Sequence, residues 1–123
     1  MRQKFEVILL GEVWDLLNNI EEKAKGKILY NLDKSKYVNN PGLFKKLDDD
    51  IWEFRTKYSR TYYRLFSFWD KTDKSEILVV ATHGLIKKTS KVPKTEIDKA
   101  REIMRLYFKQ KQDKWGLWKI KID

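Results

Sequence analysis

The sequence has no cysteine and a single histidine, and these two absences exclude several kinds of chemistry. Without cysteine there is no disulfide, no thiolate nucleophile and no cysteine-ligated zinc, and one histidine cannot build a multi-histidine metal site. The 5 glycines stand far apart, so neither a Walker-type loop nor a G-x-G-x-x-G turn occurs. We therefore expect no metal and no cofactor.

Long apolar runs are also missing from the sequence. The longest, residues 77–81, is far shorter than the roughly 20 residues that a membrane span requires. The N-terminus lacks the apolar stretch of a signal peptide. We therefore expect a soluble, cytoplasmic protein with no membrane contact, and 123 residues predict a single domain over 1–123.

Charge is plentiful and mainly positive. The 27 Lys and Arg against 18 Asp and Glu give a net charge of +9. Residues 84–123 hold 12 basic against 5 acidic side chains, a net charge of +7, which leaves +2 for residues 1–83. A chain this basic favours polyanionic partners, nucleic acid first, although a solvated lysine-rich helix would give the same count.

The hydrophobic pattern predicts an α+β fold with helices before and after an antiparallel meander. We expect helices to cover one face of the sheet and function to lie on the other. The expected strands are residues 4–9, 51–57, 61–69, 76–83 and an edge strand at 115–123, and the expected helices are residues 13–24, a short one around 28–32, and one that starts near Thr95.

A tight turn at residues 59–60 would place Arg55 opposite Arg64 on paired strands. Like charges that face each other destabilise a strand pair, so they require either a carboxylate between them, such as Glu53, or an anionic ligand. We favour the ligand, without excluding the ion pair. Alternation puts further side chains on this face, namely Lys57, Tyr62 and Phe66.

A basic segment follows the last strand of the meander. It contains the only histidine, His83, and the lysines Lys87, Lys88 and Lys91. Taken singly, a histidine at a strand end and a lysine cluster are both typical of solvated side chains. Next to Arg55, Arg64 and Tyr62 they favour a surface for single-stranded nucleic acid, because cations neutralise phosphates while aromatic rings stack on bases.

Three blocks stand in order along this part of the chain: Ile-Trp-Glu-Phe-Arg at 51–55, Tyr-Arg-Leu-Phe at 63–66, and the segment 83–100 that begins His-Gly-Leu-Ile-Lys-Lys. In order and spacing they resemble the HigB-like, phage-associated branch of the RelE/ParE toxin superfamily. The resemblance covers residues 44–108, so 113–123 form a C-terminal extension outside it. Leu85 stands where that family typically has Phe, a conservative change.

The resemblance implies a fold of two N-terminal helices packed on a twisted antiparallel sheet, with a C-terminal helix. It implies the toxin of a type II toxin–antitoxin system: a metal-independent mRNA endoribonuclease that inhibits translation, generally on the ribosome. The implied partner is a helix-turn-helix antitoxin, HigA-like, through which alone the toxin meets operator DNA.

RNA cleavage without a metal uses the 2′-oxygen as an internal nucleophile, so the protein assists deprotonation, stabilises the phosphorane and helps the leaving oxygen depart. We expect Arg55 and Arg64 to clamp the scissile phosphate. His83 is the ordinary base near neutral pH, and Lys87 binds a flanking phosphate or protonates the leaving oxygen. The expected RNA-binding residues are Lys57, Tyr62, Lys88 and Lys91.

Two other functions remain open at this point. One is a ParE-like toxin that poisons DNA gyrase and has no nuclease activity. The other is a basic RNA-binding module without toxicity. A histidine with a lysine pair at the end of the sheet favours RNA cleavage over both.

Overall fold

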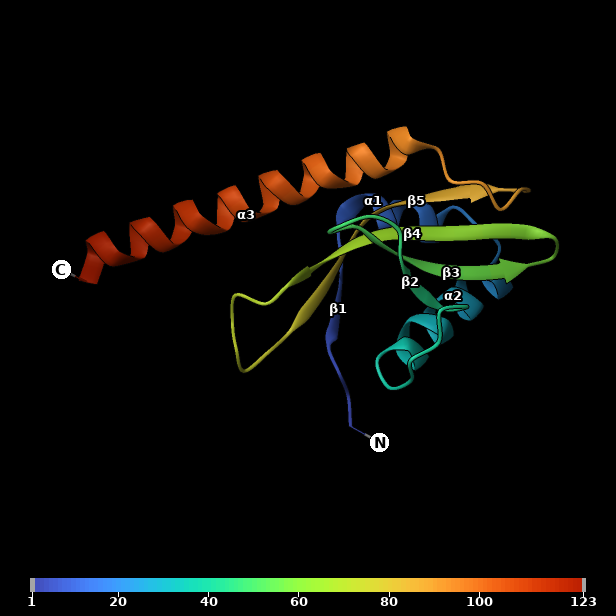
Figure 1. Ribbon diagram of the computed structural model, residues 1–123, viewed down its shortest axis with the longest axis horizontal. Helices are drawn as coiled ribbons and strands as arrows, with labels where there is room; N and C mark the ends of the chain where they lie inside the picture. The colour runs from blue at the N-terminus through green and yellow to red at the C-terminus, as the bar shows by residue number, and fades with distance from the viewer. Residues whose placement is uncertain (1, 123) are drawn as a thin grey trace.

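A five-stranded sheet separates two helices on one face from a third helix on the other (Figure 1). The computed structural model describes the backbone of residues 2–122 and the side chains of residues 2–113. The predicted α+β fold is confirmed. Its elements are β1 (Glu6–Leu9), α1 (Gly11–Asn18), α2 (Glu22–Ser35), β2 (Phe44–Lys46), β3 (Trp52–Tyr58), β4 (Thr61–Asp70), β5 (Leu78–Lys87) and α3 (Lys94–Ile122).

The sheet has the strand order β1-β5-β4-β3-β2. Strands β2 to β5 form an antiparallel meander as expected, but β1 pairs with β5 in parallel, so the sheet is mixed. A parallel pair needs a long crossover, and everything between β1 and β5 supplies it. The three-residue edge strand β2 was not predicted from the sequence.

Some predicted element boundaries are wrong. The first helix ends at Asn18, and Gly26 lies inside α2 instead of interrupting a helix. Residues 115–122 continue α3 and do not form an edge strand. An alternating pattern this short does not exclude a helix, and extending an existing helix avoids the cost of a new nucleus.

Each face of the sheet has its own hydrophobic core. On one face α1 and α2 pack on side chains such as Phe54 and Leu65. On the other, the first half of α3 packs on Phe66, Phe68 and Val80. The expectation of one open face is therefore wrong, because α3 packs on part of it, away from the β3–β4 turn (Figure 1).

Gly84 on β5 marks a close approach of α1 to the sheet. A Cβ atom at this position would lie 2.5 Å from Leu16 Cδ1 and 3.0 Å from Leu65 Cδ2. Both neighbours belong to the core between α1 and the sheet, so a larger side chain would force at least Leu16 to move. A glycine within the strand thus allows this close packing.

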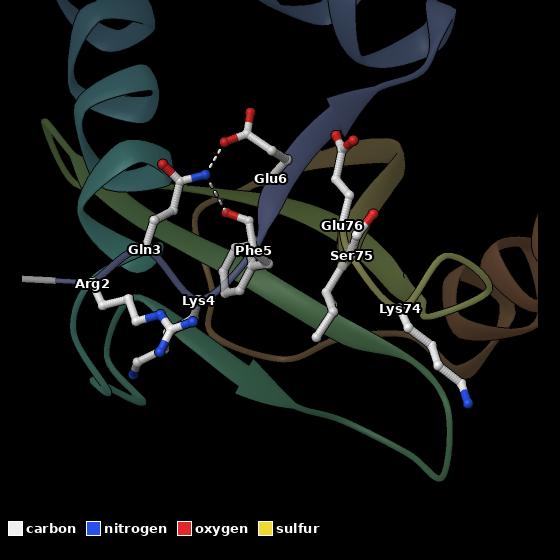
Figure 2. A pocket seen from close by; sticks show the side chains of 9 residues that line it. Arg2, Gln3, Lys4, Phe5, Glu6, Lys74, Ser75 and Glu76 are labelled. Carbon is white, nitrogen blue, oxygen red and sulfur yellow. Dashed lines mark hydrogen bonds between the residues drawn. The ribbon is translucent and has the colours of Figure 1, made fainter.

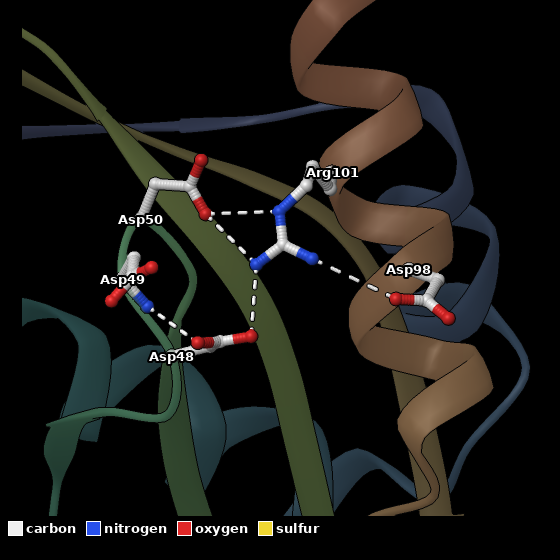
Figure 3. Close-up of polar contacts among 5 residues, drawn as sticks. All are labelled: Asp48, Asp49, Asp50, Asp98 and Arg101. Atoms are coloured by element: carbon white, nitrogen blue, oxygen red, sulfur yellow. Dashed lines mark hydrogen bonds and ion pairs between the residues drawn. The ribbon is translucent and has the colours of Figure 1, made fainter.

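Polar contacts that hold α3 in place include two groups with acidic side chains outside the helix. Tyr107 and Lys111 both donate to the buried carboxylate of Asp70, at 2.6 Å each. Nearer the start of α3, Arg101 pairs with Asp48 and Asp50 of the β2–β3 loop (Figure 3). These contacts add to the apolar packing that holds α3 on the sheet.

A hollow of about 590 Å³ lies between the segment that leads into β1 and residues 74–77 (Figure 2). Its wall is held by the Gln3 amide, which donates to the Phe5 carbonyl at 3.0 Å and to the Glu6 carboxylate. It lies away from the β3–β4 turn (Figure 1). No helix in the described part of the chain has the length and apolar character needed to cross a membrane.

Candidate nucleic-acid interface

The β3–β4 turn sets the register of the candidate interface. Its two central residues, Ser59 and Arg60, have φ angles of 50° and 65°. Positive φ at both positions is the type I′ geometry, which matches the twist of the flanking strands. The predicted pairing of Arg55 with Arg64 is confirmed, and Lys57 pairs with Tyr62.

The uncovered part of the sheet next to this turn carries a row of side chains across three strands. Lys57, Tyr62 and Lys87 are neighbours on β3, β4 and β5, and both lysines are exposed. Lys57 Nζ lies 5.2 Å from the centre of the Tyr62 ring, and Arg64 Cζ lies 5.4 Å from it. The aromatic ring thus lies between an exposed and a buried cation. We call this row, with Arg55 and Arg64 behind it, the cationic end.

Arg64 is buried, although we expected it to clamp a phosphate on a face without helices. Only 2% of its side chain is exposed, because it donates through Nη1 to Glu53 Oε1 at 2.5 Å and through Nη2 to the Ser90 carbonyl at 2.7 Å. Arg55 Nε lies 3.1 Å from the same Glu53 oxygen, and its side chain is 30% exposed. The facing arginines are therefore bridged by a carboxylate, the ion-pair alternative.

One carboxylate between two guanidinium groups leaves a net positive charge at this point. Burial raises the pKa of Glu53 above its ordinary value, while Arg64 and Arg55 act to lower it. Two polar atoms of the cluster, Glu53 Oε2 and Arg64 Nε, are buried and have no hydrogen-bond partner among the described residues. The exposed side of Arg55 therefore presents positive charge that Glu53 only partly neutralises.

His83 is also buried, beneath the first turn of α3. Its ring stacks on Phe66 at 5.0 Å, its Nδ1 lies 2.9 Å from the Thr82 hydroxyl, and its Nε2 lies 3.3 Å from Glu96 Oε2. Burial and the nearby Lys99 lower the pKa of His83, although Glu96 acts to raise it. The side chain is therefore neutral near pH 7, and it lies inside the structure and not on its surface.

The loop between β5 and α3 borders the cationic end. Lys88 and Lys91 are both exposed on it, and the Ser90 carbonyl connects it to Arg64. On the other side Arg55 Nη1 donates to the Pro41 carbonyl at 3.4 Å. A hollow of about 140 Å³ lies beside Arg55, lined by Gly42, Arg55, Thr56, Lys57, Tyr62, Tyr63 and Arg64.

The structure thus brings most of the predicted site residues together. Arg55, Arg64, Lys57, Tyr62 and Lys87 lie on adjacent strands, and the Lys88–Lys91 loop is beside them. Only His83 is set apart, opposite Phe66 and one row farther from the turn. Pro41 and Gly42 were missed as neighbours of the site, since a turn signal in the sequence does not say which strand the turn will touch.

The sequence match to a known family spans the whole of this arrangement. The model of the family described as Phage derived protein Gp49-like (DUF891) matches residues 15–105. The chain belongs to the Gp49-like family. This is a RelE/ParE-like, toxin-associated family, so a toxin with an antitoxin partner is the function consistent with it at a coarse level. No curated protein and no solved structure matches the chain significantly.

Proposed function

We propose that this Gp49-like protein is the toxin of a HigB-like type II toxin–antitoxin system and cleaves mRNA on the ribosome without a metal. The observation that carries the proposal is the row of Lys57, Tyr62 and Lys87 with Arg55 beside it. Exposed cations next to an aromatic ring suit a flexible single strand, whose phosphates they neutralise and whose bases the ring stacks on.

The proposed reaction is an internal transfer within the RNA. The 2′-hydroxyl loses its proton, the 2′-oxygen attacks the adjacent phosphorus, and the bond to the 5′-oxygen breaks as that oxygen takes up a proton. The negative charge that develops on the phosphoryl oxygens is met by donors already in place. Arg55 supplies the exposed guanidinium, and the buried charge of Arg64 lies directly behind it.

The proton transfers are assigned to Lys87, which is exposed at the cationic end, and to His83, which is buried farther from the turn. Lys87, exposed next to Tyr62, donates the proton to the leaving 5′-oxygen. His83 is our candidate base because burial holds it neutral, and its Nε2 would exchange Glu96 for the 2′-hydroxyl. Lys57, Tyr62, Lys88 and Lys91 bind the flanking nucleotides.

An inhibitor belongs to this proposal, because an active nuclease of this kind harms the cell that makes it. We propose a helix-turn-helix antitoxin that presents acidic side chains to the +9 chain. Electrostatic steering would then make its association rate fall as salt increases. Such an antitoxin is also the route by which this protein comes to operator DNA.

The experiment is single-turnover cleavage of mRNA on programmed ribosomes, read by primer extension, with chelator present. Cleavage by the wild type and its loss in Arg55→Ala are expected, and Lys23→Ala, an exposed lysine on α2, is the matched control. Intact message with inhibited gyrase supercoiling would favour the ParE-like function instead. Binding to RNA without cleavage or growth inhibition would favour the non-toxic module.

A further inference from the structure

A third hollow lies where β3 begins and β4 ends, at the opposite end of these strands from the β3–β4 turn. It has a volume of about 510 Å³, the size of pockets that hold small organic ligands. We call it the Trp pocket, and its lining is Lys46, Asp49, Asp50, Trp52, Trp69, Lys71 and Met104. None of these residues belongs to the cationic end.

Two indole rings form the apolar wall of the Trp pocket. Trp52 and Trp69 meet edge to face with their centres 5.6 Å apart, and the ring of Phe44 stacks on Trp52 at 4.8 Å. Lys71 Nζ lies 5.0 Å from the centre of the Trp69 ring. Among the described residues Trp69 Nε1 is buried with no hydrogen-bond partner. The wall therefore combines a fixed aromatic surface with a cation, the combination that holds a nucleobase and its phosphate.

The acidic loop beside the pocket adds a feature that distinguishes one base from another. Asp48 and Asp50 are both occupied by Arg101, whereas in the described part of the chain the Asp49 carboxylate has no ion pair (Figure 3). A carboxylate accepts two hydrogen bonds side by side, and guanine presents adjacent N1–H and N2–H donors on its Watson–Crick edge. Uracil has only one N–H donor there, between two carbonyl oxygens.

The edge strand β2 connects the Trp pocket to the cationic end. Lys45 pairs with Glu53 on the face that carries the arginines, and the next residue, Lys46, pairs with Trp52 at the pocket. Arg55 and Trp52 are three residues apart on β3, about 10 Å along the strand, and their side chains point to opposite faces of the sheet. A single strand that joins the two sites therefore passes around the edge strand β2, where Lys45 and Lys46 lie on opposite faces and each contact a phosphate.

We propose that the Trp pocket binds a guanine base of the same RNA strand whose scissile phosphate lies at the cationic end. The indoles stack on the base, Asp49 accepts from its N1–H and N2–H groups, and Lys46 and Lys71 contact the adjoining phosphates. The inference rests on the proposed function, since it assigns a base-specific contact to the proposed RNA substrate.

Binding is the measurement, because it does not depend on cleavage. Fluorescence anisotropy would follow labelled 2′-O-methyl RNA, which lacks the nucleophile, as oligo(U) with and without one internal guanine. We expect the guanine to tighten binding in the wild type and to have no effect in Asp49→Ala. Trp69→Phe should weaken binding of the guanine oligonucleotide by about 5-fold or more, at the low end of base stacking because one ring is kept.

Lys71→Ala gives a readout that a structural role would not change. Loss of one phosphate contact should reduce the slope of log K against log salt by about 0.7 for a single strand. Trp14→Ala and Lys23→Ala, exposed on α1 and α2, are the matched controls and should leave affinity and slope unchanged. Thermal melting of each variant shows that it is folded.

Each alternative result overturns a stated part of the proposal. Equal affinity with and without guanine overturns the base assignment, and unchanged binding in folded Trp69→Phe and Lys71→Ala overturns the subsite itself. Free GMP that binds as tightly as the oligonucleotide would replace RNA by a free nucleotide as the ligand. If the wild type fails to cleave mRNA on ribosomes while the expected guanine-dependent binding is found, the proposed function is overturned and the guanine subsite still holds.

Discussion

Glu53 and Asp70 are both 1% exposed, lie on the same sheet and contact basic side chains, yet their surroundings differ. Asp70 accepts four hydrogen bonds, from Lys111, Tyr107, and the amide and hydroxyl of Thr72. Glu53 uses one oxygen for two arginines, and its other oxygen has no partner among the described residues. One carboxylate is fully satisfied, and the other is not.

The two pKa shifts follow this difference. Burial acts to raise the pKa of Asp70, but the hydrogen bonds from Lys111, Thr72 and Tyr107 bring it well below its ordinary value. For Glu53 burial has the larger effect, and its pKa is raised. A complete network is typical of a structural contact, here the attachment of α3, whereas incomplete satisfaction with excess positive charge is typical of a site that binds something.

Of the variants that test this difference between Glu53 and Asp70, Arg64→Ala should cause the largest loss of unfolding free energy. It leaves Glu53 buried without its closest partner, and breaking a buried pair in this way costs about 3 to 5 kcal/mol of unfolding free energy. Urea denaturation measures it. Replacing both partners, Glu53→Leu with Arg64→Met, should recover much of the loss because no charge is then left uncompensated. If Arg64→Ala is as stable as the wild type, the ion pair between Glu53 and Arg64 contributes nothing to the free energy of unfolding.

Arg55→Ala should greatly reduce RNA cleavage with little loss of stability. The side chain is 30% exposed, and Glu53 keeps its bond to Arg64, so we expect a loss of stability below about 1 kcal/mol. The rate of single-turnover RNA cleavage should fall about 10²- to 10³-fold, as for loss of one donor to a transition state. Arg105→Ala, which removes an exposed arginine paired with Glu102, is the control. An unchanged rate would remove Arg55 from the site.

Asp70→Asn should affect stability and leave cleavage chemistry unchanged. The amide cannot accept from Lys111 and Tyr107 as a carboxylate does, so unfolding free energy should fall by about 2 kcal/mol. Because the pKa of Asp70 is lowered in the folded protein, its contribution is present above the unfolded pKa and is lost as pH falls below about 4. Melting curves against pH should therefore be flatter in the variant below that pH. If wild type and variant lose stability in parallel as pH falls, the pH dependence comes from a group other than Asp70.

Among these variants, His83→Asn should have the smallest effect on stability, visible as a change in the pH dependence of melting. Burial lowers the pKa of His83, so the unfolded chain binds the proton more readily and stability declines as pH falls below about 6.5. The variant should lack this decline below about pH 6.5. Thermal melting in matched buffers measures it, and Thr89→Ala, an exposed residue of the neighbouring loop, should keep the wild-type profile.

Local pattern was enough to predict much of the fold and part of the site. Alternation along two strands and a two-residue turn predicted the facing of Arg55 and Arg64, because side-chain period and turn length together determine register. The convergence of Lys57, Tyr62 and Lys87 follows from the same register and one further strand. Boundaries of α1 and α2, the strand β2 and the helical residues 115–122 were missed, since each depends on contacts beyond the local pattern.

By itself the sequence determined the basic charge, the exclusion of thiolate and multi-histidine chemistry, the α+β class and the pairing of β3 with β4. Only the tertiary structure decided that α3 covers part of the second face, that Arg64 and His83 are buried, and that Glu53 serves both arginines. The reason is that burial depends on which distant element packs over a side chain. Alternation says which face a residue occupies but not what lies above it.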